Sequence, residues 1–127
     1  MDVTDGLIVT TGSNRRYRAL QQWDLGSGAL LRDVPWLPAA PDAPPCLLYA
    51  VRAGRRGSGA AGRVAAGGSG AAEVRVVRAD DETEACGAPL ARLHGLPSAV
   101  YGLAFDADQT RLLVVCADAV HVCDQLW

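Results

Sequence analysis

The sequence has no lysine: all 12 of its basic residues are arginine, against 14 acidic residues in a chain of 127. The formal net charge is -2, whereas a general nucleic-acid-binding domain is strongly basic. No stretch approaches the roughly 20 consecutive apolar residues of a membrane span. The acidic start Met1–Asp5 also lacks the features of a secretory signal. We therefore expect no membrane or nucleic-acid partner, and a cytoplasmic or nuclear location.

Cysteine and histidine are scarce and widely spaced. The Cys-x2-Cys spacing of a zinc site is absent, and the two histidines, His94 and His121, lie far apart. We expect four reduced thiols rather than a metal site. The cysteines concerned are Cys46, Cys86, Cys116 and Cys123. Disorder is excluded as well, because 50% of the residues are hydrophobic.

The apolar residues occur in short runs that are bounded by Gly, Pro, Asp and Ser, which is typical of a chain of brief strands. Valines alternate with Arg75 and with His121, the period of two expected for a strand whose two faces differ. No long window holds an uninterrupted helical period. We predict about ten strands and an all-β fold. The runs are 7–10, 19–23, 29–34, 46–51, 63–66, 73–78, 89–93, 100–105, 111–116 and 119–123.

Three of these segments, 20–24, 74–78 and 120–124, align with one another. Each follows an apolar run and a turn of small residues. The repeat is long and unequal, but the four-stranded blade of a β-propeller repeats every ~40–45 residues and accepts insertions in its loops. A propeller needs four or more blades to close its ring, so a chain of this length holds only part of one.

Two stretches resemble the WD40 repeat proteins. Residues 8–31 contain the Trp23-Asp24 dipeptide, a turn and an outer strand, and residues 93–113 contain a histidine-glycine loop and an inner strand that ends Ala104-Phe105. The resemblance implies a WD40-like β-propeller segment of about two and a half four-stranded antiparallel blades, in a ring not closed by this chain alone. It also implies structural roles for Trp23, Asp24 and Asp118.

The sequence departs from the family pattern at several positions. Leu96 stands where the family has a histidine, and Val77 and Cys123 stand where the second and third repeats would have tryptophan. Of the residues that fix a blade by hydrogen bonds in that family, only Trp23 and Asp118 match. We therefore expect these blades to depend mainly on apolar packing.

The repeats divide the chain into four parts. We expect strands two to four of one blade in 1–34, a proline-rich connection in 35–45, a second blade with Gly/Ala-rich loops in 46–93, and a truncated third blade in 94–127. The open strand edges would pair with a partner or with the rest of the chain's own propeller. A fragment or short isoform of a longer protein and a natural partial propeller both fit this pattern.

No catalytic, cofactor or metal site is expected. Gly57–Gly62 fits G-x-G-x-x-G, but Arg63–Gly70 is too interrupted by glycine for the helix that a dinucleotide site requires, which favours a hairpin loop. Ser58 and Ser69 lack the pattern of a nucleophile elbow. The acidic run 80–84 lacks the ligand spacing of a calcium loop and is interpreted as a solvated turn.

The candidate partner contacts are Arg15, Arg16, Tyr17 and Trp36. Arginine and aromatic side chains dominate interface energies, and these residues fall on one face if the strand order is correct. The alternative is that the arginines form a solvated turn and that Trp36 packs between blades. Arg55, Arg56 and Arg63 would form a second patch on the opposite face.

The sequence therefore predicts a non-catalytic scaffold or adaptor segment that binds other proteins as part of a multi-subunit complex. Two alternatives stay open. One is a small β-domain that binds an anionic ligand or RNA through its arginine-rich loops, and the other is an enzyme of propeller fold.

Overall fold

The computed structural model describes residues 1–12, 20–36, 42, 47–70, 72–79 and 89–124. These residues form eleven β-strands and no helix, so this part of the chain has no helix that could span a membrane. The strands are β1 (Asp2–Thr4), β2 (Leu7–Thr11), β3 (Leu20–Asp24), β4 (Leu30–Val34), β5 (Leu48–Ala53), β6 (Arg63–Gly68), β7 (Val74–Arg78), β8 (Ala91–Leu93), β9 (Gly102–Phe105), β10 (Arg111–Val115) and β11 (Val120–Asp124).

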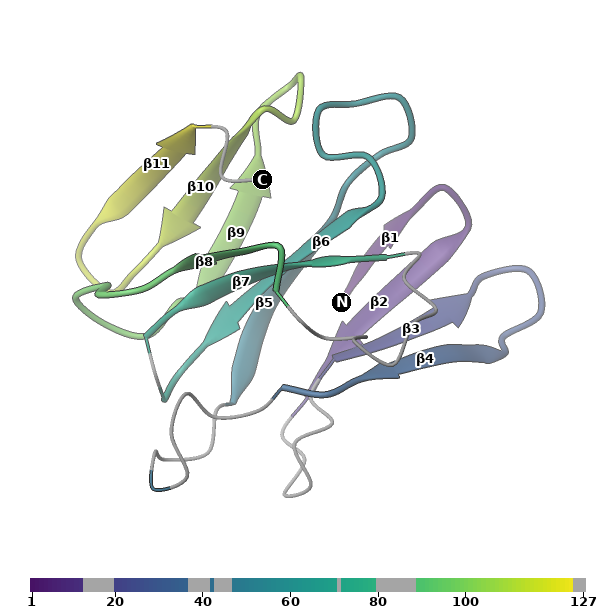
Figure 1. Cartoon of the computed structure of the whole chain (residues 1–127), viewed down its shortest axis with the longest axis horizontal. Helices are drawn as coiled ribbons and strands as arrows, with labels where there is room; N and C mark the ends of the chain where they lie inside the picture. Colours follow the sequence, from purple (N-terminus) through teal and green to yellow (C-terminus); the bar gives the residue numbers. More distant parts are fainter. Residues whose placement is uncertain (13–19, 37–41, 43–46, 71, 80–88, 125–127) are drawn as a thin grey trace.

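The strands form three antiparallel sheets in chain order (Figure 1). The first sheet is β1-β2-β3-β4, the second is β5-β6-β7-β8, and the third is β9-β10-β11. The first strands of the three sheets are neighbours, because β5 contacts β1 on one side and β9 on the other. This is the arrangement of a partial propeller with an open ring. The all-β prediction and the propeller architecture are confirmed.

The first sheet differs from the expectation that it would lack its first strand. Residues Asp2–Thr4 form β1, which pairs with β2 through Asp2↔Val9 and Thr4↔Leu7. The reversal is a tight turn in which Asp5 and Gly6 adopt positive φ angles of 49° and 81°. Three residues beside such a turn are too short for a period of two to be visible in the sequence.

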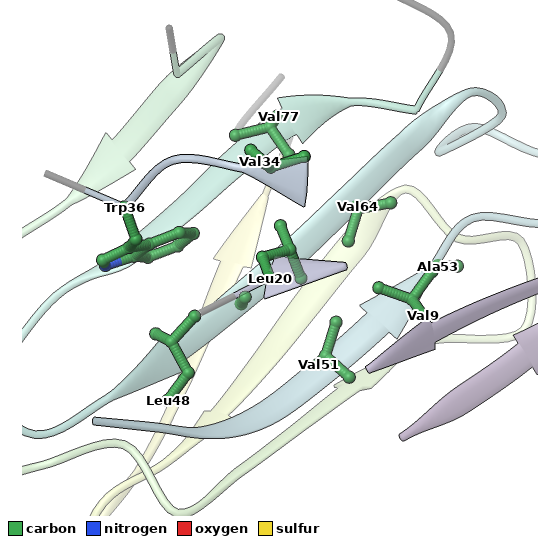
Figure 2. Close-up of a cluster of buried hydrophobic side chains, with 10 residues drawn as sticks. Val9, Leu20, Val34, Trp36, Leu48, Val51, Ala53, Val64 and Val77 are labelled. Carbon is green, nitrogen blue, oxygen red and sulfur yellow. The ribbon is translucent and has the colours of Figure 1, made fainter. Parts of the chain in front are cut away.

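One core fills the space between the first and second sheets (Figure 2). Large aliphatic side chains of the two sheets meet there, and most are less than 2% exposed. Such contacts explain why the short runs become strands, since each run buries one face against a neighbouring sheet. The cluster consists of Val9, Leu20, Val34, Trp36, Leu48, Val51, Ala53, Val64, Ala66 and Val77.

A second core fills the space between the second and third sheets. It joins Ala65, Val74 and Val76 of the second sheet to Leu103 and Leu112 of the third. The second sheet is therefore covered on both faces, and β6 is buried along almost its whole length. Small side chains suit this position: a β-carbon on Gly67 would lie 3.1 Å from the side chain of Val100.

Trp36 belongs to the first of these cores and is only 2% exposed. The guanidinium of Arg75 lies over its ring, 4.8 Å from the ring centre, and Arg75 forms a buried ion pair with Glu73. A side chain held in this way does not reach the surface, so the expectation of Trp36 as an exposed partner contact is wrong in this chain. The alternative, in which Trp36 packs between blades, describes its position. Although Trp36 lies at the start of a proline-rich connection, burying its large aromatic ring in the core is favourable enough to hold it there.

Candidate interaction surfaces

The β5–β6 loop, residues 54–62, lies at one end of the three sheets and is hydrogen-bonded to both neighbours. Toward the first sheet, the backbone N–H of Ala53 donates to Asp2 Oδ2 over 2.8 Å. The N–H of Arg56 donates to the carboxylate of Asp5 in the β1–β2 turn. Two acidic side chains of one sheet thus satisfy backbone donors of the next.

Toward the third sheet, the loop is fastened to the β9–β10 turn. Gln109 Oε1 accepts hydrogen bonds from the N–H of Arg55, over 2.7 Å, and from Ser58 Oγ, over 2.6 Å. The N–H of Gly59 donates to the carbonyl oxygen of Asp108, and the Arg55 guanidinium donates to that of Ala107. Gln109 is 7% exposed and has a φ of 56°, so this contact is enclosed although the loop around it is not.

The glycines of this loop are explained by its own geometry. Gly57 and Gly62 have φ angles of 77° and 69°, which L side chains adopt reluctantly. A β-carbon on Gly59 would lie 2.7 Å from the carbonyl oxygen of Gln109. The loop joins two antiparallel strands, and β6 begins at Arg63. The hairpin prediction is confirmed, and the G-x-G-x-x-G pattern here has no phosphate-binding helix behind it.

Two cavities open at this end of the sheets. The first, of about 430 Å³, lies between β1, β5 and β9, and its polar lining residues include Asp2, Arg52, Arg55 and Asp106. Hydrogen bonds from the backbone N–H groups of Arg111 and Thr110 hold the pKa of Asp106 below its usual value. The lining of this cavity therefore carries both acidic and basic side chains.

The second cavity, of about 440 Å³, borders the loop itself. Its polar and charged lining residues are Arg55, Arg56, Ser58, Asp5 and Asp108. The exposed side chains of Arg55 and Arg56 are two of the three residues of the predicted second patch. Within the described part of the chain, no group of three His, Cys, Asp or Glu side chains could hold a metal ion.

An exposed aromatic pair was missed by sequence reasoning. Tyr49 of β5 and Tyr101, directly before β9, stack with their ring centres 5.8 Å apart and their planes 3° apart. Their side chains are 48% and 57% exposed. Each tyrosine lies in or beside the innermost strand of its sheet, at the end opposite the β5–β6 loop. No motif joins residues 49 and 101, because the pair exists only when the two sheets pack side by side.

The other predicted site residues have separate positions. Arg15, Arg16 and Tyr17 lie outside the described residues. Asp24 closes the β3–β4 turn, where its Oδ2 accepts hydrogen bonds from the N–H and the hydroxyl of Ser27. These bonds lower the pKa of Asp24. Asp118 is exposed in the β10–β11 turn.

Trp23 is half-buried on the face of the first sheet that points away from the second. Its strand neighbour Gln22 is 1% exposed on the opposite face, toward the second sheet. The indole Nε1 of Trp23 donates to Thr10 Oγ1 over 3.0 Å. Beside them, Gln21 Nε2 donates to Asp33 Oδ1. This open face is therefore stabilised by its own cross-strand hydrogen bonds.

The outer face of the third sheet is open and aliphatic. Val115 pairs with Val120, and Leu113 pairs with Val122, so their side chains share one face. Val120 and Val122 are 59% and 60% exposed. The intervening His121 lies on the face opposite these valines, and Cys123, on the same face as His121, packs against the second core. Burial raises the pKa of the Cys123 thiol.

Comparison with solved structures supports the propeller fold. The chain is similar to the β-propeller domain of Cps50 (Swd1) from Myceliophteria thermophila, with a TM-score of 0.61 and 11% sequence identity. The match covers 94% of this chain and 36% of that chain. No protein-family model and no curated protein matches the sequence. The fold is shared with a longer propeller, and the WD40 repeat remains a resemblance of particular residues.

Proposed function

We propose that this chain is a non-catalytic scaffold segment of a longer WD40-like propeller in the cytoplasm or nucleus, and that it binds other proteins. The observation that carries the first part of the proposal, a longer propeller, is the open aliphatic face of the third sheet. Leu113, Val115, Val120 and Val122 form a continuous apolar surface, and such surfaces mark places where another protein surface packs.

The edges of the sheets agree with this proposal. Among the described residues, the third sheet has three strands where the other two have four, and none of them pairs with the outer edge of β11. An edge strand beside an apolar face invites a further strand or sheet. Further blades, supplied by the rest of a longer chain, would cover this face. The open face of the first sheet would pack against a further blade on the opposite side of this segment.

The exposed loops and turns then remain for partner proteins. We infer that the Tyr49–Tyr101 pair is the strongest contact in the described part of the chain, because exposed aromatic rings contribute much of the energy of protein interfaces. Arg15, Arg16 and Tyr17 stay candidate contacts. The mixed charges around Arg55 and Arg56 favour protein surfaces over RNA, whose phosphates require an excess of positive charge.

Association of the isolated chain tests the role of the open face. We expect the chain to self-associate in sedimentation experiments, and we expect Val120→Asp and Val122→Asp to reduce this association. Leu90→Asp is the matched control, because Leu90 is 46% exposed but lies on the second sheet's outer edge. A chain that stays monomeric at high concentration, before any substitution, would contradict the proposal that this face is normally covered.

Partner binding tests the tyrosine pair. Tyr49→Ala and Tyr101→Ala, placed in the longer protein, should keep its melting temperature and lose its bound partners. If binding instead weakens steeply with salt and survives both substitutions, the arginine loops and an anionic ligand become the better explanation.

A further inference from the structure

The β5–β6 loop carries a pattern that the scaffold function does not use. Ser58 follows Arg55-Arg56-Gly57, so arginine stands three and two positions before a hydroxyl. No other serine or threonine of the sequence has arginine at both positions. Arginines placed in this way can be recognised through bidentate bonds to carboxylates, which is how arginine-directed protein kinases select a substrate serine.

The structure presents this segment at the surface. Arg55, Arg56, Gly57 and Gly59 are exposed, and Ser58 is partly so. Ser58 has glycine on both sides, so the two adjacent residues carry no side chain that would hinder access to it. The cavity bordered by Arg55, Arg56 and Ser58 opens at the same place. A kinase active site can therefore approach the loop from the solvent side.

The hydroxyl of Ser58 also has a structural role that phosphorylation would end. Ser58 Oγ lies 2.7 Å from the carbonyl oxygen of Arg55 and 2.6 Å from Gln109 Oε1. Both partners are acceptors, so the serine proton is shared between them. The contact to Gln109 joins the second sheet to the third.

We propose that Ser58 is a phosphorylation site for an arginine-directed protein kinase, and that the phosphoryl group releases the β5–β6 loop from the β9–β10 turn. In the reaction, Ser58 Oγ attacks the γ-phosphorus of ATP, and the Oγ–P bond forms as the bond to the β,γ-bridging oxygen breaks. ADP leaves, and the hydroxyl proton passes to the base of the kinase.

The release follows from hydrogen-bond chemistry. A phosphoserine ester oxygen carries no proton, so it cannot donate to Gln109 Oε1 or to the Arg55 carbonyl. The phosphate oxygens are acceptors with about -1.5 to -2 charges, and Asp5 and Asp108 line the same cavity as Ser58, so their carboxylates would repel the phosphate. The guanidinium of Arg55 would turn to the phosphate and leave the carbonyl oxygen of Ala107, its present partner.

The first test is phosphorylation of the full chain by the catalytic domain of an arginine-directed kinase with ATP, followed by mass spectrometry. We expect one phosphate on Ser58, none on the Ser58→Ala variant, and full incorporation into Ser69→Ala, whose serine is also flanked by glycines. Arg55→Gln and Arg56→Gln should each lower the initial rate by about tenfold, as expected for loss of a charge-assisted contact.

Three results would contradict the proposal that Ser58 is a phosphorylation site. They are phosphate on another residue, a rate that does not depend on the two arginines, and incorporation only after the chain has been unfolded by heat.

The second test is hydrogen exchange of the phosphorylated and unmodified chains. Amides of residues 55–59 and 107–110 should exchange faster after phosphorylation, whereas those of β2 and β3 should not change. Ser58→Ala should show a smaller increase, because it loses the hydrogen bonds without adding charge. Equal exchange in the phosphorylated and unmodified chains would disprove the release of the loop.

Discussion

The indole N–H of Trp23 and the hydroxyl of Thr10 form a 3.0 Å hydrogen bond between adjacent strands of the first sheet. The bond lies on the face of the first sheet that points away from the second, and neither of the other two described sheets covers it. In the sequence, only Trp23 and Asp118 match the residues that fix a WD40 blade by hydrogen bonds, and Thr10, the partner of Trp23 in the structure, was not assigned.

Trp23→Ala should destabilise the chain by about 2 kcal/mol, below the ~3–5 kcal/mol typical of a fully buried tryptophan. The reason is that Trp23 is only half-buried here, so part of its ring is already in water. Thr10→Val should cost about 1 kcal/mol, the usual net value of one hydrogen bond. Urea denaturation measures both. A loss of stability of 3–5 kcal/mol for Trp23→Ala would show that another surface covers this face in solution.

Gly59→Ala should cost about 1–3 kcal/mol, because its β-carbon would meet the backbone of Gln109 at 2.7 Å. Gly12→Ala is the matched control, since Gly12 has open space around it and needs no positive φ. Thermal melting of both variants checks the prediction. Similar melting temperatures for the two would mean that the loop does not approach the third sheet so closely.

Glu73→Gln should cost about 1.5–3 kcal/mol, the usual range for a hydrogen bond to a charged group, because it removes the carboxylate of Glu73 from the buried guanidinium of Arg75. Replacing both members of the pair with apolar residues, as Glu73→Leu with Arg75→Met, should cost less than Glu73→Gln alone. Chemical denaturation of Glu73→Leu, of Arg75→Met and of the double variant gives the coupling energy between the two residues. If the losses of stability of the two single variants add up to that of the double variant, the ion pair contributes no free energy of its own.

The β3–β4 turn should depend on pH through Asp24, whose pKa is lowered by hydrogen bonds from Ser27. A carboxyl whose folded pKa is below its unfolded value stabilises the fold above the unfolded value of 3.8. This contribution is lost as the pH falls through the folded pKa. Melting temperatures measured from neutral to acid pH should fall less steeply for Asp24→Asn than for the parent. Identical slopes would contradict the prediction.

The sequence predicts the sheets much better than the surfaces between them. Alternation around Arg75 and His121 placed two strands correctly, although β7 is covered on both faces and only β11 has one exposed face. By contrast, the Tyr49–Tyr101 stack and the Gln109 contacts join residues more than 50 positions apart in the chain. Those contacts depend on the angle between sheets, which no local pattern encodes. Trp36 shows the same limit, because its burial depends on packing against the second sheet, which its local sequence does not reveal.

The small residues of β6 have a geometric consequence. Ala65 packs toward the third sheet and Ala66 toward the first, while Gly67 leaves room for Val100. The volume of the side chains on β6 therefore affects the distance between the second sheet and its two neighbours. Larger residues at these positions would push the inner strands apart and change the angle at which successive blades splay. The spacing of the three described sheets thus depends partly on the width of three small residues in the middle sheet.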